Sequence, residues 1–318
     1  MTFVDPEALM RIRSLELRAK VVVEGFFHGL HRSPFHGFSV EFSEYRQYSP
    51  GDDPRYLDWR LYARSDRYYI RRFEDETNLR CHLLVDRSRS MAYGSVAYSK
   101  GEYARTAAAT LAYFLASQRD AVGLVTFDDK VIEYIPARYR PGHFRRLMHS
   151  LDGEASGRAT DVGAPIEEIA RTVTKRSMIV LISDLLAPLD SLEVDLGFLR
   201  SRGHDAVIFH IIDPAEAAFE FESPSVFEDL ESGRDLYVDA QAVRDHYLRG
   251  HREHTARIER ACASLGIDYH RFTTDRPLEL ALLDFVSARL RRGRRTLRRR
   301  GGRGGAPAHV VSGREVGG

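Results

Sequence analysis

The sequence predicts an α/β protein built on a doubly wound, mostly parallel β-sheet of the Rossmann type. From residue 78 to residue 290, short apolar runs alternate with longer segments of helical periodicity. This order is typical of parallel strands joined by right-handed helical crossovers. Short oxygen-bearing side chains also follow the apolar runs, at the strand ends where open α/β sheets bind ligands. An N-terminal helix and a β-structured extension are expected ahead of the sheet.

The first 76 residues are expected to form this helix and extension. Asp5-Pro6-Glu7 is a helix start signal, and apolar side chains then recur at helical spacing as far as Phe26, which predicts one helix over residues 5–27. After a loop-like segment, the pattern favours short strands within 38–48 and 68–74. The Asp- and Arg-rich segment between these strands is interpreted as a structural ion-pair network around Trp59.

The remaining elements follow from apolar runs and amphipathic periodicity. Strands are expected at 78–85, 121–127, 130–136, 177–183, 205–212 and 267–272. Helices are expected at 97–118, 141–151, 163–174, 189–202, 239–265 and 278–290, with a hairpin at 226–239. The turn at Asp128-Asp129 predicts that the strand after it is an antiparallel edge. The two histidines of His251-Arg252-Glu253-His254 are three residues apart, unlike the metalloprotease pattern, and are interpreted as a solvated helix face.

Five oxygen donors occur at strand ends or just before a predicted helix. They are Asp86, Ser88, Ser90, Thr160 and Asp184. Each alone could be a turn or helix-cap residue. Together they lack any Cys or His, and they suit a hard divalent cation, with Mg²⁺ preferred over Mn²⁺ or Ca²⁺.

Composition restricts the class of protein. The 318 residues carry a formal net charge of +1, but residues 289–318 hold ten Arg and one Glu, which leaves about −8 for the rest of the chain. Two cysteines provide no disulfide framework, and no apolar run is long enough to span a membrane, so a cytoplasmic location is expected. The Arg/Gly-rich segment 292–318 is expected to be a disordered tail. A solubilising or membrane-surface role is favoured for this tail over nucleic-acid binding, which stays an alternative.

The five donors resemble the metal-ion-dependent adhesion site (MIDAS) of von Willebrand factor A domains, which reads Asp-x-Ser-x-Ser, then Thr, then Asp. The sequence before them, with Gly51-Asp52-Asp53 and Asp58-Trp59, is similar to a bacterial family named domain of unknown function 58 (DUF58). The resemblance covers residues 8–290 and implies a von Willebrand A-like domain. Many relatives have two membrane helices near the N-terminus, which this sequence lacks. The expected organisation is therefore 1–76, 77–291 and 292–318.

The resemblance also implies a function. In von Willebrand A domains a carboxylate from a partner protein completes the metal's coordination shell. Proteins of this type are encoded beside MoxR-type AAA+ ATPases, which implies such an ATPase as partner and chaperone-like assembly as the process. No P-loop motif occurs in the sequence. We therefore expect a non-enzymatic, metal-dependent interaction module without a small-molecule substrate. A Mg²⁺-dependent hydrolase or phosphatase is the alternative, although no general base stands beside Asp86.

Overall fold

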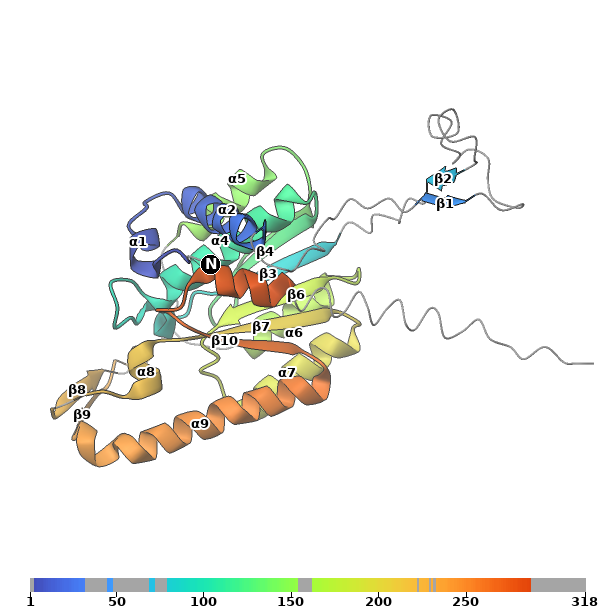
Figure 1. Ribbon diagram of the computed structural model, residues 1–318. Helices are drawn as coiled ribbons and strands as arrows, with labels where there is room; N and C mark the ends of the chain where they lie inside the picture. The colour runs from blue at the N-terminus through green and yellow to red at the C-terminus, as the bar shows by residue number, and fades with distance from the viewer. Residues whose placement is uncertain are drawn as a thin grey trace, which may run out of the picture.

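A computed structural model describes residues 3–31, 45–47, 69–71, 79–153, 162–221, 223–228, 230 and 233–286. Its centre is a six-stranded sheet with the order β10-β7-β6-β3-β4-β5 (Figure 1). The strands are β3 (Arg80–Asp86), β4 (Ala121–Phe127), β5 (Val131–Arg138), β6 (Met178–Ser183), β7 (Asp205–Ile212) and β10 (Asp268–Thr273). All neighbours are parallel except β4 and β5, so the predicted fold class and the antiparallel edge are confirmed.

Strand β3 lies in the middle of the sheet and marks the point where the chain reverses direction across it. The chain first extends from β3 to β4 and β5, and then returns to the other side of β3 to add β6, β7 and β10. Val85 of β3 pairs in register with Ile182 of β6. The carboxyl ends of these two strands therefore lie side by side at the topological switch point, where ligands bind in this class of fold.

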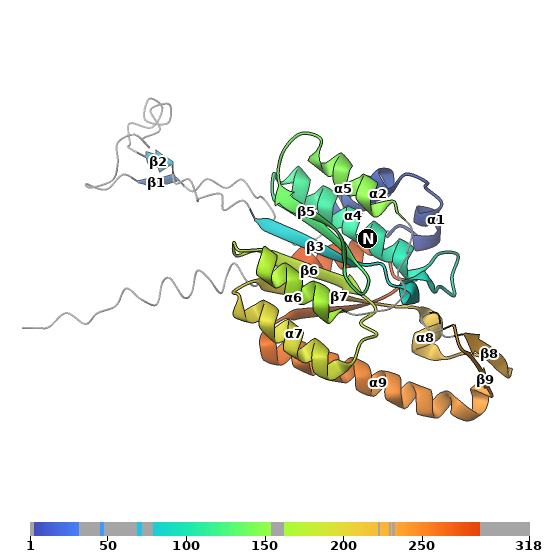
Figure 2. The same cartoon turned by 180° about the vertical axis from the view of Figure 1, so that it is seen from behind.

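Helices cover both faces of the sheet (Figures 1 and 2). One layer contains α1 (Pro6–Met10), α2 (Leu15–His31), α4 (Lys100–Ser117), α5 (His143–Leu151) and a helix at 278–286. The other contains α6 (Gly163–Thr172), α7 (Leu189–Ser201) and α9 (Ala240–Leu265). Alternate residues of β3 pack against the two helix layers: Leu83 and Val85 belong to the core under the first layer, and Leu84 belongs to the core under the second. Each core strand is thus buried on both faces, which explains its continuous apolar sequence.

The N-terminal helix is interrupted, contrary to the prediction of one helix over residues 5–27. The first helix ends at Met10, and Ser14 begins the second by accepting a hydrogen bond from the Leu17 backbone N–H at 3.3 Å. The buried Arg18 guanidinium fills the break, where it donates to the carbonyl oxygen of Met10 at 2.6 Å. The apolar face that was predicted is nevertheless buried, because α2 packs on α4 in the same core.

Replacing Arg18 by methionine is expected to lower the free energy of unfolding by about 1–3 kcal/mol. The change leaves backbone carbonyls of the break without their donor, and it removes a 2.7 Å ion pair with Glu102 of α4. Urea denaturation would measure the effect, with the exposed Arg13→Met in the same break as control. Equal midpoints for the two variants would contradict this role of Arg18.

Smaller elements extend from the carboxyl ends of the strands. They are η2 (Arg89–Ala92), α8 (Pro214–Ala218) and the hairpin of β8 (Ser225–Glu228) with β9 (Asp235–Val238). The hairpin was predicted, whereas η2 and α8 were not. Among the described residues of the N-terminal extension, β1 (Tyr45–Gln47) and β2 (Tyr69–Arg71) form an antiparallel pair within the predicted strand segments.

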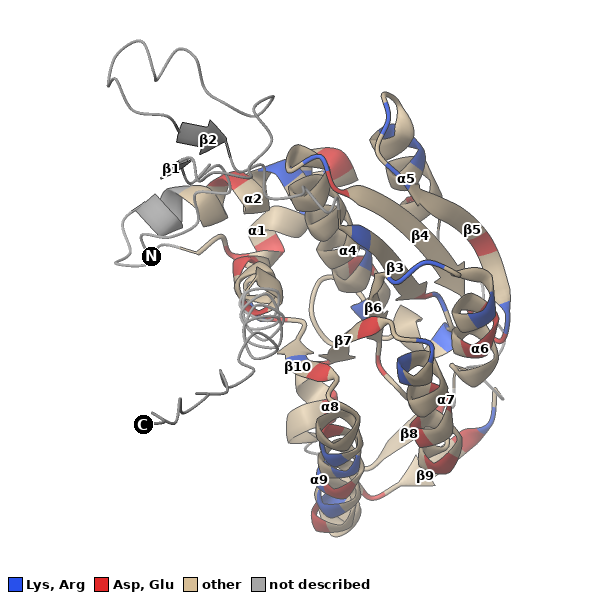
Figure 3. Ribbon diagram, turned by 90° about the vertical axis from the view of Figure 1, so that its right-hand side faces the viewer, with Lys and Arg blue, Asp and Glu red and all other residues tan. Residues whose placement is uncertain are grey.

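Acidic and basic side chains are interspersed along α9, which projects past the sheet towards the hairpin (Figure 3). Within the described residues, no helix combines the length and the apolar character needed to cross a membrane.

Candidate metal and carboxylate site

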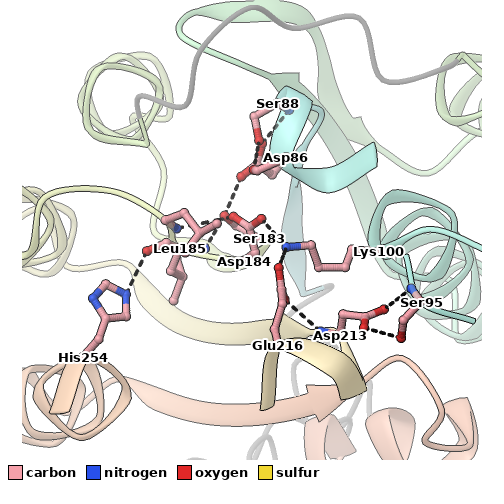
Figure 4. A network of polar contacts seen from close by, with 12 residues as sticks. Asp86, Ser88, Ser95, Lys100, Ser183, Asp184, Leu185, Asp213, Glu216 and His254 are labelled. Atoms are coloured by element: carbon pink, nitrogen blue, oxygen red, sulfur yellow. Dashed lines mark hydrogen bonds and ion pairs between the residues drawn. The ribbon is translucent and has the colours of Figure 1, made fainter. Parts of the chain in front are cut away.

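Asp86 is the last residue of β3 and is 1% exposed. One carboxylate oxygen accepts a 2.8 Å hydrogen bond from the Ser88 backbone N–H, and the other accepts from the Ser183 hydroxyl at the end of β6 (Figure 4). Asp86 therefore ties the loop after its own strand to the neighbouring strand. In the sheet, β3 lies between β6 and β4, so the Asp86 carboxylate is flanked by strands on both sides.

The two serines of the motif converge beside Asp86. Ser88 is fully buried, and Ser90 lies in η2. Their hydroxyl oxygens are 3.0 Å apart. The backbone carbonyl of Ser88 accepts from the Met91 N–H at 3.1 Å, which closes the short turn and directs both hydroxyls to one place. The alternating Asp-x-Ser-x-Ser spacing is thus realised as one cluster of oxygen atoms.

Asp184 follows β6 and is 2% exposed. Its position next to the end of β3 brings a second buried carboxylate to the cluster. Burial, and then the negative charge of Asp184, raise the pKa of Asp86 to about 7, although hydrogen bonds from Ser183 and Ser88 act in the opposite direction. Leu185, the next residue, has a left-handed φ of 54°, an uncommon conformation for leucine and one that tends to occur at functional sites.

Lys100 is a member of this site that the sequence reasoning missed. It begins α4 and is 1% exposed. Its ammonium donates to Asp184 at 2.9 Å and to Glu216 of α8 at 2.6 Å (Figure 4). Burial by itself would lower the pKa of Lys100, but these two carboxylates outweigh it and raise that pKa. A cation in the first turn of a helix also opposes the helix dipole, and this local misfit was the available sequence signal.

A third strand end contributes Asp213, which was also missed. It follows β7, is fully buried, and accepts a 2.8 Å hydrogen bond from the Ser95 backbone N–H. Asp213 also caps α8, with Glu216 accepting from its backbone N–H at 3.0 Å. The loops after β3, β6 and β7 are therefore joined in one polar network. The Asp-Pro-x-Glu capping box was readable in the sequence.

The helix face that carries His251 and His254 is turned partly towards this network, so its interpretation as a solvated face holds only in part. Both side chains are half-buried. The Nε2 atom of His254 lies 3.3 Å from the carbonyl oxygen of Leu185, and the His251 ring stacks on Tyr247. The cause is that α9 continues beyond the sheet and reaches the loop after β6.

The structure thus brings together four of the five predicted ligands: Asp86, Ser88, Ser90 and Asp184. Thr160 lies outside the described residues. Two carboxylates and two hydroxyls form a set of oxygen donors that fits a hard cation such as Mg²⁺. Across the described parts of the chain, no group of three or more His, Cys, Asp or Glu side chains could hold a metal. A cation here would therefore depend on hydroxyl as well as carboxylate oxygen.

The sequence matches one protein family over most of its length. The family described as “Protein of unknown function DUF58” matches residues 44–257. An uncharacterized protein of Mycobacterium tuberculosis (strain ATCC 25618 / H37Rv) is 29% identical over 292 residues, which cover 90% of this chain and 91% of that protein.

Solved structures that match part of this chain share little sequence with it. An aerotolerance-related membrane protein from Bacteroides fragilis is 18% identical, with 64% of this chain and 96% of that chain covered and a TM-score of 0.47. The VWA domain of SpRpn10 is 16% identical, with 63% and 92% covered and a TM-score of 0.37.

Proposed function

Because the chain belongs to the DUF58 family, which matches residues 44–257, we propose that it is a metal-dependent protein-interaction module without catalytic activity of its own. The observation that carries this proposal is the pair of buried carboxylates, Asp86 and Asp184, beside two converging serine hydroxyls at the switch point of the sheet. In folds of this class that position is the ligand site.

Asp86, Ser88, Ser90, Thr160 and Asp184 would hold the cation, with Mg²⁺ first and Mn²⁺ or Ca²⁺ as substitutes. When bound, the cation supplies an open position that a carboxylate of another protein can fill. The neutral hydroxyls of Ser88 and Ser90 add ligands without adding charge, so the site does not repel an incoming carboxylate. Lys100 adds a positive charge to the site, because its ammonium binds Asp184 and Glu216.

The partner proposed is a MoxR-type AAA+ ATPase, with chaperone-like assembly as the shared task. Support comes from the family and from the sequence, which has no P-loop motif and so would rely on its partner for ATP hydrolysis. The proposal places the complex in the cytoplasm.

The test is a binding measurement between the purified chain and a purified MoxR-type ATPase from the same genome, with Mg²⁺ and with EDTA. Binding is expected only with Mg²⁺ and is expected to disappear in Asp86→Ala. Asp190→Ala is the matched control, because Asp190 is a surface residue of α7 whose side chain is 90% exposed. Equal binding in EDTA would refute metal-dependent recognition. Calorimetric titration of the chain with Mg²⁺ alone would then show whether the site binds a cation at all.

A further inference from the structure

An apolar cavity of about 700 Å³ opens directly beside the oxygen cluster. Ser90 of the cluster and Lys100 of the ion-pair network both line it. The other walls come from the loop after β6, from α8, from the β8–β9 hairpin and from α9. Its size and its apolar lining are typical of a cavity that takes a ligand group. The cavity is thus continuous with the proposed carboxylate site.

Aromatic rings from several elements line the cavity. Phe219 stacks on Tyr247 of α9 with ring centroids 4.2 Å apart, and it also stacks on Phe227 of β8 at 5.8 Å. Phe221 meets Phe227 edge to face at 5.1 Å. Phe219 has a left-handed φ of 48°, so its backbone is held in an uncommon conformation to place this ring. The rings support one another across separate elements and leave a preformed apolar wall.

The rim of the cavity is also apolar. Leu186 and Val226 line the cavity, yet they are 51% and 62% exposed. Tyr237 of β9, which pairs with Val226 across the hairpin, is 72% exposed. Large apolar side chains grouped at the mouth of a cavity indicate a protein interaction surface rather than ordinary surface exposure.

The charges at the inner end select what can enter. Asp184 and Glu216 pair with the ammonium of Lys100, and the buried carboxylate of Asp86 lies beside Asp184. Three carboxylates against one ammonium give an excess of two negative charges. A bound divalent cation cancels this excess of two and allows an acidic group to approach. The aromatic wall can bind an apolar group whether or not a cation is bound. A ligand that satisfies both ends therefore has a carboxylate next to a bulky apolar group.

We propose that the cavity binds a large aromatic or aliphatic side chain of the partner, within a segment whose neighbouring Asp or Glu binds at the Ser90–Asp184 edge. The recognised partner is thus a protein with an exposed acidic-apolar segment. This inference rests on the proposed function for its acidic half only. Its apolar half comes from the aromatic wall and the exposed hairpin.

The test selects displayed random peptides on the immobilised full chain in Mg²⁺, and then measures the affinity of the enriched peptides. Val226→Asp places a charge at the cavity mouth, and Val194→Asp is its matched control, because Val194 is 70% exposed on α7 and does not line the cavity. Enriched peptides are expected to pair an acidic with a large apolar residue. They are expected to lose about tenfold or more in affinity on Val226→Asp but not on Val194→Asp.

Other outcomes separate the two ideas. Metal-dependent acidic peptides that ignore Val226→Asp would overturn the cavity inference and leave the proposed function intact. Apolar peptides that bind equally in EDTA would instead contradict the proposed function, and with it the acidic half of the segment. The inference is also overturned if the wild-type chain enriches no peptides beyond those that the Val226→Asp variant enriches. A dimer of the chain that dissociates on Val226→Asp would overturn it as well, because a second copy would then cover this face.

Discussion

Replacing Asp86 by asparagine is expected to have two opposite effects: weaker function and a more stable metal-free fold. Asparagine can still accept from the Ser88 N–H and can contact Ser183, so the hydrogen-bonded framework survives. It cannot supply the negative charge that a cation needs. Mg²⁺-dependent partner binding is therefore expected to fall by about 100-fold or more, as when one member of a buried charged contact is lost.

The gain in stability follows from the raised pKa of Asp86. The pKa is about 7 in the folded chain, against the ordinary value of 3.8 for an aspartate, so the folded state binds the proton more tightly. Stability is consequently highest below pH 3.8 as far as this group is concerned, falls as the pH rises from 3.8 to about 7, and stays lower above that. The difference is about 3 pKa units, each worth about 1.4 kcal/mol, so removal of the charge can add up to about 4 kcal/mol at pH 8.

Urea denaturation in EDTA at pH 8 and at pH 5 would measure this effect. The advantage of Asp86→Asn over the wild type should be larger at pH 8. Asp190→Asn, on the exposed surface of α7, should show no difference at either pH. An Asp86→Asn protein that is less stable than the wild type at pH 8 would mean that the carboxylate serves the fold rather than a ligand.

Replacing Lys100 by methionine is expected to have the largest effect on stability. Its ammonium is the partner of Asp184, which is almost fully buried, and of Glu216, whose side chain is 24% exposed. Without it, carboxylates remain beside one another with no counter-charge. Loss of one partner from a buried ion pair costs about 3–5 kcal/mol. The free energy of unfolding of the metal-free chain should fall by that amount.

Mg²⁺ should restore part of the stability of Lys100→Met, because ligand binding to the folded state stabilises it. The gain should exceed that of the wild type, because the carboxylates of the variant have lost their counter-charge. Thermal unfolding with and without Mg²⁺ would report both effects. Lys20→Met is the control, since Lys20 forms only a surface pair with Glu24 at 3.7 Å. A Lys100→Met protein as stable as Lys20→Met would refute the role of the ammonium as the counter-charge of this site.

Local pattern was enough to predict most of the sheet and the buried carboxylates at the ends of β3 and β6. Strands such as β6 are buried on both faces, so their sequence is a continuous apolar run that stands out. Asp86 and Asp184 follow such runs directly, and parallel neighbours place their ends together without further information. The interruption of the first helix was missed because Ile12 continues the apolar periodicity across it. The Ser14 cap is a weaker signal than that periodicity.

Lys100 could not be found in this way because its environment is not local. In sequence a lysine at the start of a helix is expected to be exposed. Its burial depends on Asp184, 84 residues away, and on Glu216, 116 residues away. The aromatic wall of the cavity has the same origin, since its rings come from separate elements that only the folded chain brings together.

The contact between the two ends of the described chain has a consequence for the order of folding. The Val4 backbone N–H donates to the Glu279 carboxylate at 2.8 Å, and α2 shares one core with the helix at 278–286. This layer joins helices from the two ends of the described residues. During translation the apolar face of α2 is therefore exposed until α4 and the segment around residue 280 have been synthesised. Such long sequence separation slows folding and favours protection of nascent chains by chaperones.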